Sequence, residues 1–227
     1  MPLILHLHPL SSYCWKALIA LYEAGAPFEA RRVDLGEAAS RDAFLALWPI
    51  GKMPVLEDRA RGRVTPETSI IIEYLDRWYP GEAPMLPAEP EAQLEARLWD
   101  RLYDTYVHLP TQKAVAGVLT GDPTLASQAE ARSRQELAIA YGLIEKALEG
   151  RAWAAGEAFT IADCAAAPAL FYARTIAPFP PEAKRLAAYF ERLVERPSFA
   201  RVLDEARPWF SMFPLKERLE ARFAGGA

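Results

Sequence analysis

Short apolar runs and apolar positions with helical spacing alternate over the first third of the chain. Runs short enough to be strands lie at residues 3–8, 28–33, 53–58 and 63–65. Helical spacing is found at residues 11–24, 40–47 and 67–78. Thr65 and Pro66 are placed to cap and open the last of these helices. The resulting order β-α-β-α-β-β-α predicts a small mixed sheet covered by helices.

The amino-acid composition becomes rich in proline at one place along the chain, residues 80–90, which read P-G-E-A-P-M-L-P-A-E-P. Prolines remove hydrogen-bond donors and disfavour helix in the residue before them, so we interpret this segment as a linker between domains. The sequence therefore predicts an α/β domain over residues 1–79. Every later periodic stretch is helical, which predicts an all-helical domain over residues 91–227.

The helices expected in the second domain lie at residues 91–119, 125–148, 161–175, 181–195 and 199–207. We expect Pro110 to bend the first of them. Thr160 and Asp163 have the spacing of a capping box, in which each side chain accepts a hydrogen bond from the backbone N–H of the other residue. We interpret this pair as a folding element without a catalytic role.

Composition and charge narrow the class of protein. The 26 Lys and Arg and 30 Asp and Glu give a net charge of −4, which argues against nucleic acid as the main partner, because nucleic-acid-binding surfaces are basic. Having only Cys14 and Cys164 excludes a disulfide framework and favours the cytoplasm. We expect no membrane segment, since no uncharged stretch reaches about 18 mainly apolar residues. His6 and His8 have no third ligand at a fitting spacing, so we expect no metal site.

The first candidate chemistry lies where the first strand meets the first helix, in the sequence Ser11-Ser12-Tyr13-Cys14. A helix N-terminus carries free N–H groups and about half a positive charge, so it stabilises an anion such as a thiolate. A serine hydroxyl there can donate a hydrogen bond to that anion. The residues alone also fit a simpler role, in which Ser11 or Ser12 only caps the helix. Cys14, one turn into the helix, fits a small buried side chain.

Two further segments have the features of a site for an extended, peptide-like ligand. Met53–Pro54 opens a strand, and a cis bond there would expose the backbone N–H and C=O of Met53, although the residues alone favour a trans bond. Glu67 and Thr68 begin a helix, where a carboxylate can hold an ammonium group while a hydroxyl and free N–H groups hold a carboxylate. The same residue types also favour helix starts for stability alone.

The order and spacing of these segments resemble those of the cytosolic glutathione transferases over nearly the whole chain. The matching stretches are H-P-L-S-S-Y-C-W-K, P-I-G-K-M-P-V-L, P-E-T-S-I-I-I-E-Y-L and F-T-I-A-D-C-A-A-A-P-A-L. The resemblance implies a thioredoxin-like glutathione-binding domain followed by an all-helical domain. It also implies that the Met53–Pro54 bond is cis.

Carried over position by position, the resemblance implies a glutathione site on the first domain. Its residues would be Ser11, Lys52, Met53, Pro54, Glu67 and Thr68. Ser11, the catalytic residue, would donate a hydrogen bond to the glutathione sulfur, and the backbone before the cis-proline would pair with the cysteinyl part. Lys52 would lie near the glycyl end. Glu67 and Thr68 would hold the γ-glutamyl end, with Thr68 standing where serine is usual.

The resemblance also implies a function, namely transfer of the glutathione thiolate to small apolar electrophiles in detoxification, with glutathione as co-substrate and no metal. The helical domain would contribute the electrophile pocket, for which Tyr106 and Trp209 are candidates. The family resemblance further implies a cytoplasmic homodimer. Two alternatives stay open. S-S-Y-C-W-K is similar to the S-S-C-x-W-R start of the maleylacetoacetate isomerases, which use glutathione to isomerise a cis double bond, and a transferase-like domain can also serve as a binding module without catalysis.

Overall fold

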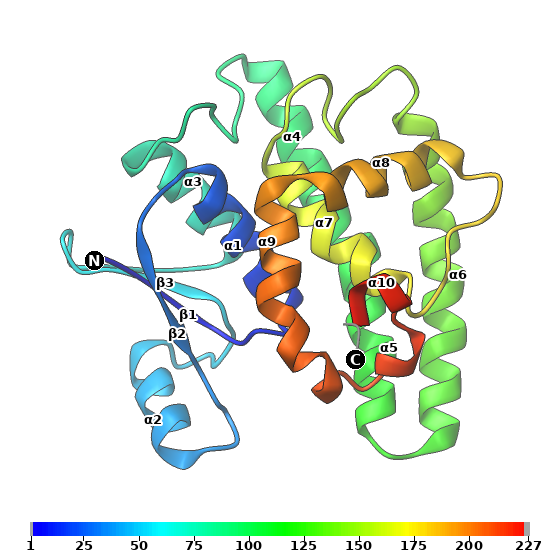
Figure 1. The fold of residues 1–227 in the computed structure, drawn as a ribbon, viewed down its shortest axis with the longest axis horizontal. Coiled ribbons are helices and arrows are strands. Elements are labelled where there is room, and N and C mark those ends of the chain that lie inside the picture. The colour runs from blue at the N-terminus through cyan, green and yellow to red at the C-terminus, as the bar shows by residue number, and fades with distance from the viewer. Residues whose placement is uncertain (1, 225–227) are drawn as a thin grey trace. The chain divides into compact units, whose positions relative to one another are not determined.

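The protein consists of two units, one that ends at Leu86 and one that begins at Pro87. The structure is a computed structural model, which describes residues 2–224 (Figure 1). The elements follow the order β-α-β-α-β-β-α in the first unit, as the sequence predicts, and are helices in the second. The predicted fold class, an α/β domain followed by an all-helical domain, is therefore confirmed.

A four-stranded mixed sheet with the order β2-β1-β3-β4 forms the centre of the first unit. Its strands are β1 (Leu3–Leu7), β2 (Phe28–Arg32), β3 (Val55–Asp58) and β4 (Arg63–Pro66). β1 pairs in parallel with β2 and antiparallel with β3, and β3 pairs antiparallel with β4. Every residue of β1 is buried, as expected of a central strand that is covered on both faces.

Three helices cover this sheet, namely α1 (Ser12–Glu23), α2 (Ala38–Leu47) and α3 (Thr68–Trp78). α1 and α3 lie side by side on one face, and α2 lies on the other (Figure 1). Phe44 of α2 packs against Val33, which follows β2, and against Val55 of β3. The apolar side of this short helix therefore attaches it to the sheet.

The start of α3 corrects one expectation. Thr65 and Pro66 belong to β4, where they pair with Leu56 and Val55 of β3, so they neither cap nor open the helix. The N-cap is Glu67, whose φ of 65° lies in the left-handed region that favours glycine. Glu67 is the single residue between the end of β4 and the start of α3, and the chain makes this connection with its left-handed backbone conformation.

The second unit is built from helices. They are α4 (Pro90–Leu102), η1 (Tyr103–His108), α5 (Leu109–Leu119), α6 (Pro123–Ala147), α7 (Ile161–Ala173), α8 (Lys184–Glu195), α9 (Pro197–Ala206), η2 (Arg207–Met212), η3 (Lys216–Arg218) and α10 (Ala221–Ala224). Every residue of α7 is buried, so this helix is the core of the unit. An amphipathic helix would be exposed to water on one side, whereas a helix that is mostly apolar all round has to be surrounded by other elements.

The capping box that the sequence predicts at the start of α7 is confirmed. The Thr160 hydroxyl accepts a hydrogen bond from the Ala162 N–H at 3.3 Å, and the Asp163 carboxylate accepts from the Thr160 N–H at 2.8 Å. Asp163 also accepts hydrogen bonds from the Ala154 N–H at 2.9 Å and the Tyr189 hydroxyl at 2.6 Å. Burial raises the pKa of Asp163, while these donors favour its ionised form. The carboxylate thus joins α7 to the preceding loop and to α8.

A π-helical segment, η1, lies between α4 and α5 where the sequence predicts one long helix with a bend at Pro110. Proline has no N–H, and its ring crowds the carbonyl four residues earlier, which here belongs to Tyr106. A wider turn before Pro110 relieves that crowding. Trp99 and Tyr103, which precede Tyr106 at helical spacing, are buried in the core, whereas Tyr106 is 61% exposed.

Candidate active site

One edge of the sheet in the first unit gathers three of the predicted site segments. Because β1 and β3 are antiparallel, the end of β1 lies beside the start of β3. β3 and β4 are antiparallel too, so the end of β4 lies at the same edge. Ser11, Pro54 and Glu67 follow or precede these strand ends and are therefore brought close to one edge. α1 and α3 begin there as well, and the free N–H groups of the two helix starts favour an anion.

Ser11 is the N-cap of α1. Its hydroxyl oxygen accepts a hydrogen bond from the backbone N–H of Cys14 at 3.4 Å, so the capping role that the sequence left open is present. A hydroxyl can accept and donate at once, so the cap uses only the oxygen of Ser11. The Ser11 side chain also forms a hydrogen bond with the Cys14 side chain, which lowers the pKa of that thiol but less than burial raises it. Ser11 is half-buried, whereas Ser12 is buried. Of the two serines, Ser11 is the more exposed.

The turn before α1 is held in place by its own hydrogen bonds. The Ser11 N–H donates to the His8 carbonyl at 3.0 Å, and the Leu10 N–H donates to His8 Nδ1 at 3.2 Å. The indole N–H of Trp15 donates to the Pro9 carbonyl at 2.6 Å. Ser11 is therefore fixed at the end of β1 by hydrogen bonds within the turn.

Cys14 lies in the first turn of α1 and is fully buried. Burial raises the pKa of its thiol to about 12. The prediction of a small buried side chain at this position is confirmed. A thiol with such a pKa is not the nucleophile of a thiol–disulfide exchange at neutral pH, because the thiolate is the reactive form.

The Met53–Pro54 peptide bond is cis, as the resemblance implies and contrary to what the residues alone favour. Pro54 is buried, Met53 is half-buried and Lys52 is exposed. Pairing between β3 and β1 begins at Val55 and so leaves Met53 outside the ladder. A backbone at the end of a ladder can extend the pairing to an added peptide strand, which is a common mode of peptide recognition.

Glu67 and Thr68 differ in exposure. The Glu67 side chain is exposed and makes no capping hydrogen bond to α3, so it does not serve the helix in the way that acidic residues at helix starts often do. Thr68 is the first residue of α3 and is buried. The exposed Glu67 carboxylate can bind an ammonium group. The Thr68 hydroxyl and the free N–H groups at the start of α3 can bind a carboxylate.

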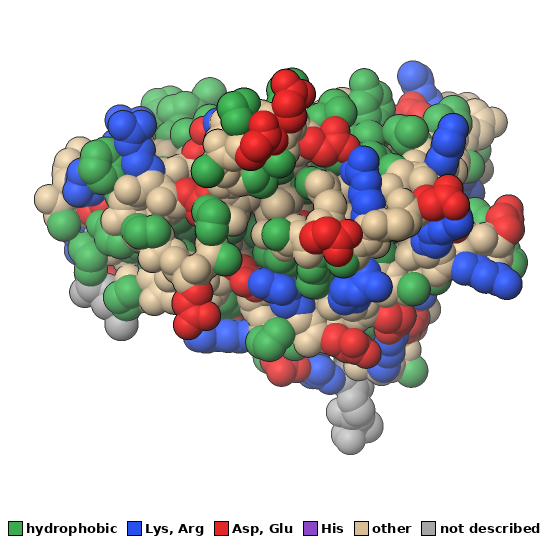
Figure 2. Space-filling model, turned by 90° about the horizontal axis from the view of Figure 1, so that it is seen from above, with side chains coloured by type: hydrophobic (Ala, Val, Ile, Leu, Met, Phe, Trp, Pro, Cys, Tyr) green, Lys and Arg blue, Asp and Glu red, His purple; other side chains and the backbone are tan. Residues whose placement is uncertain are grey.

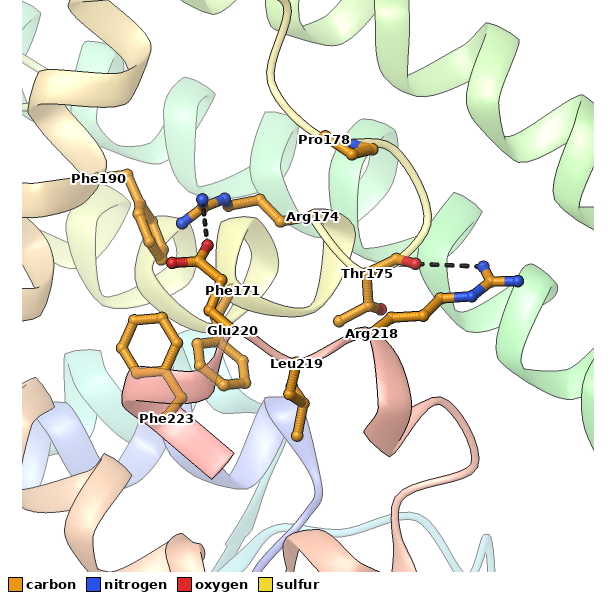
Figure 3. A pocket seen from close by; sticks show the side chains of 9 residues that line it. All are labelled: Phe171, Arg174, Thr175, Pro178, Phe190, Arg218, Leu219, Glu220 and Phe223. Atoms are coloured by element: carbon orange, nitrogen blue, oxygen red, sulfur yellow. Dashed lines mark hydrogen bonds and ion pairs between the residues drawn. The ribbon is translucent and has the colours of Figure 1, made fainter. Parts of the chain in front are cut away.

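The two candidates for the electrophile pocket lie in the second unit. Tyr106 belongs to η1 and is exposed, and Trp209 belongs to η2 and is half-buried. The side chains labelled in Figure 3 line a cavity of about 290 Å³ in the same unit, and neither candidate is among them. An ion pair between Arg174 and Glu220 lies at this cavity (Figure 3).

The described part of the chain also bears on metals and membranes. Within residues 2–224, no group of three or more His, Cys, Asp or Glu side chains is arranged to hold a metal ion. Among the described helices, none combines the length and the apolar character that crossing a membrane requires. On the face shown in Figure 2, positive and negative side chains lie beside one another.

Comparison with known proteins establishes the family. The model of the glutathione S-transferase N-terminal domain matches residues 5–83, and the model of the glutathione S-transferase C-terminal domain matches residues 111–197. The chain belongs to the glutathione S-transferase family. The mixed sheet and its helices are accordingly the thioredoxin-like domain of a glutathione transferase, followed by the family's helical domain.

Individual relatives agree with this assignment. A glutathione S-transferase of Pseudomonas putida is 31% identical over 162 residues, which cover 70% of this chain and 69% of the relative. FtsZ-localized protein A of Caulobacter vibrioides is 31% identical over 90% of this chain and 92% of its own length. Among solved structures, a glutathione S-transferase from Rhodospirillum rubrum is 26% identical, with a TM-score of 0.76 over 88% of this chain and 91% of that one.

One contact in this glutathione transferase was not predicted from its sequence. Lys16 of α1 is fully buried, and its ammonium group donates a hydrogen bond to the Ser69 hydroxyl of α3 at 3.0 Å. The signal that could have revealed it is a single cation within residues 14–21, which are otherwise apolar. Ser69 gave no signal of its own, because a serine in the first turn of a helix is common.

Proposed function

We propose that the protein conjugates the thiolate of glutathione to small, largely apolar electrophiles. The observation that carries the proposal is the gathering of Ser11, Met53 and Glu67 at one edge of the sheet, beside two helix starts. These groups match the chemical parts of glutathione, which are a sulfur, an extended peptide backbone and an amino-acid end. The family assignment supports glutathione as the co-substrate.

In the proposed complex, glutathione lies extended along this edge. The Glu67 carboxylate binds the γ-glutamyl ammonium, and Thr68 with the free N–H groups of α3 binds the γ-glutamyl carboxylate. The backbone N–H and C=O of Met53, which precedes Pro54, pair with the cysteinyl part. Lys52 attracts the carboxylate of the glycyl end. We assign this half of the site to the domain predicted over residues 1–79.

The chemical task of the site is to keep the glutathione sulfur ionised. A free thiol has a pKa of about 8.5, and lowering it by about two units requires about 2.7 kcal/mol of preferential stabilisation of the thiolate. The Ser11 hydroxyl donates one hydrogen bond to the sulfur, and the start of α1 adds its partial positive charge. The thiol proton leaves to water. A sulfur lone pair then forms a bond to the electrophilic carbon, whose leaving group departs with the electrons of the broken bond.

The rest of the proposal concerns the second substrate and the setting. We propose that Tyr106 and Trp209 of the helical domain line the electrophile pocket, since aromatic side chains suit a largely apolar ligand. We also propose that the protein acts as a homodimer in the cytoplasm and serves detoxification. The family membership supports the homodimer, the cytoplasmic location and the role in detoxification. Sedimentation at several protein concentrations would measure the oligomeric state.

A direct test combines binding with turnover. Calorimetry of the purified protein with glutathione should give saturable binding, and addition of a chloronitrobenzene should release chloride with formation of the thioether. Binding without conjugation of any of a panel of electrophiles would contradict the transferase activity. Failure to bind glutathione would contradict the site as well.

A second candidate function is a binding module without catalysis. The observation in its favour is the similarity to FtsZ-localized protein A over 90% of this chain, because the name of that relative describes a location and not a reaction. Such a module has no need of a thiolate, so it would show no conjugation and no lowered pKa of a bound thiol.

An isomerisation assay with a cis-unsaturated dioic acid in the presence of glutathione would test the isomerase alternative.

A further inference from the structure

The helix α1 carries a buried positive charge among apolar side chains. Its buried residues are Ser12, Cys14, Trp15, Lys16, Ala17, Leu18, Ile19, Ala20 and Leu21. Lys16 has no exposed surface at all. Lysine is almost never fully buried, because moving an ammonium group out of water is costly unless other groups replace the water.

The contact that Lys16 makes joins the two helices of the proposed glutathione site. Its Nζ donates to the hydroxyl of Ser69 at 3.0 Å. Ser69 is the second residue of α3 and directly follows Thr68, while Lys16 lies in the second turn of α1, after the Ser11 cap. The hydrogen bond thus connects the beginnings of α1 and α3 at the edge where both helices start.

We propose that Lys16 is a positioning residue that sets the place of the γ-glutamyl half of the site relative to the sulfur half. This inference rests on the proposed function. Glutathione gains from both halves only when Glu67 and Thr68 stand at the right distance from Ser11, and a displacement of about 1 Å in a binding site can cost about 100-fold in rate. Without the Lys16–Ser69 hydrogen bond each half keeps its own groups, and only their relative placement changes.

The test compares two thiol substrates that differ by the γ-glutamyl group. For Lys16→Met and for Ser69→Ala, we expect KM for glutathione to rise about tenfold or more while kcat at saturating glutathione stays within twofold. With cysteinylglycine, which lacks the γ-glutamyl group, kcat/KM should stay within twofold of the wild-type value. Lys184→Met, which replaces an exposed lysine of the other unit, should change neither substrate.

Melting temperatures separate positioning from stability. The Tm of Lys16→Met shows how much of any loss comes from the fold, because removing one partner of a buried polar contact can destabilise a protein. Ser69→Ala keeps the packing of α1 and tests the same contact if Lys16→Met does not fold. Equal losses for both thiols, or no change for glutathione, would overturn the inference while leaving the proposed function intact. If the wild-type protein did not bind glutathione, the proposed function and this inference would both be wrong.

Discussion

The hydroxyl of Ser11 has two tasks in the proposed function. It accepts the Cys14 N–H as the cap of α1, and it donates its hydrogen to the glutathione sulfur. The first task is visible in the structure and the second is a proposal, so a test has to separate them. The free energy of unfolding of a Ser11 variant measures the contribution of the cap, because loss of a serine cap costs about 1 kcal/mol. The ionisation of bound glutathione reports the hydrogen bond to sulfur.

Ser11→Ala should raise the pKa of the bound glutathione thiol by roughly one to two units, since one hydrogen bond to a charged acceptor contributes about 1.5–3 kcal/mol. Conjugation at neutral pH should fall and partly recover as the pH rises. The ultraviolet absorbance of the thiolate, followed against pH, measures the shift. Ser12→Ala is the matched control and should leave the titration in place. If it shifts the titration and Ser11→Ala does not, the catalytic assignment belongs to Ser12.

Glu67→Ala should weaken glutathione binding about tenfold or more, because a charge-assisted hydrogen bond to the ammonium is lost. Calorimetry measures the affinity. Glu37→Ala is a close control, since Glu37 is also an exposed N-cap glutamate in this unit that makes no side-chain capping bond. Both variants should remain folded, and only the first should lose affinity. Equal affinities would place the γ-glutamyl end elsewhere.

Cys14 should be inert in the folded protein. Burial raises the pKa of its thiol to about 12, so at neutral pH the thiol stays protonated and unreactive. Cys164 is buried too. An aromatic disulfide reagent should therefore titrate neither cysteine under native conditions at pH 7 and both of them in denaturant. Rapid labelling of Cys14 in the native protein would show that α1 opens locally, and rapid labelling of Cys164 would show the same for α7.

At the scale of elements, the sequence predicted what depends on local pattern. The run of apolar residues in β1 and the spacing of Thr160 and Asp163 are properties of a few neighbouring residues, and both were identified correctly. The start of α3 was not, because Thr65 is held in β4 by pairing with Leu56, which is a contact between strands. The burial of Lys16 was missed for the same reason. It depends on α3 packing beside α1, which helical periodicity alone does not reveal.

The start of α7 tests how much one carboxylate contributes. Asp163→Ala should destabilise the protein by more than a typical cap, because the Ala154 N–H and the Tyr189 hydroxyl would lose their acceptor in a buried place, at about 1–3 kcal/mol each. Asp122→Ala removes an exposed cap of α6 and should cost only about 1 kcal/mol. Urea midpoints of the two variants give the comparison. A smaller loss for Asp163→Ala would contradict the assignment of a folding role.

The C-terminal elements of the helical unit are attached by ion pairs. Arg222 binds Glu191 of α8, and Arg218 binds Glu130 of α6 at 3.0 Å. The two guanidinium groups hold the pKa values of Glu191 and Glu130 below the ordinary range. A carboxylate with a lowered pKa contributes stability above its unfolded pKa of about 4.3, and this contribution is lost as the pH falls through the folded value.

Arg222→Ala should therefore increase hydrogen exchange in residues 207–224 at pH 7 by a modest factor, since partly exposed ion pairs contribute at most about 1 kcal/mol. The difference from the wild type should shrink as the pH falls below the unfolded pKa of about 4.3 and through the lowered pKa of Glu191 in the wild type, because the carboxylate then becomes protonated and no longer pairs with Arg222. Arg201→Ala, which breaks an exposed pair within α9, is the control. An effect that does not depend on pH would point to lost packing of Arg222 instead.

At the scale of the whole molecule, sequence patterns predict the proposed glutathione-binding residues better than the proposed electrophile-binding residues. The glutathione half uses strand ends and helix starts of the first unit, and each of these leaves a short signature in the sequence. The electrophile half depends on which aromatic side chains a helical unit leaves uncovered. Trp99, Tyr103 and Tyr106 have the same helical spacing, yet two are buried and one is exposed. Periodicity marks the face of a helix, and tertiary packing determines which residue on it remains accessible.

Binding of glutathione should stabilise the protein by linkage. A ligand at 100 times its Kd that binds only the folded state adds about 2.7 kcal/mol, which for a chain of this length is a rise in Tm of roughly 5–11 °C if the protein unfolds in one transition. If the two units unfold separately, only the transition of the unit that ends at Leu86 should move. At the same glutathione concentration, Glu67→Ala with a tenfold higher Kd should gain only about 1.4 kcal/mol, while Glu37→Ala should keep the full shift. Scanning calorimetry measures both, and an equal rise in the Glu67→Ala variant would show that glutathione stabilises the protein without using the proposed site.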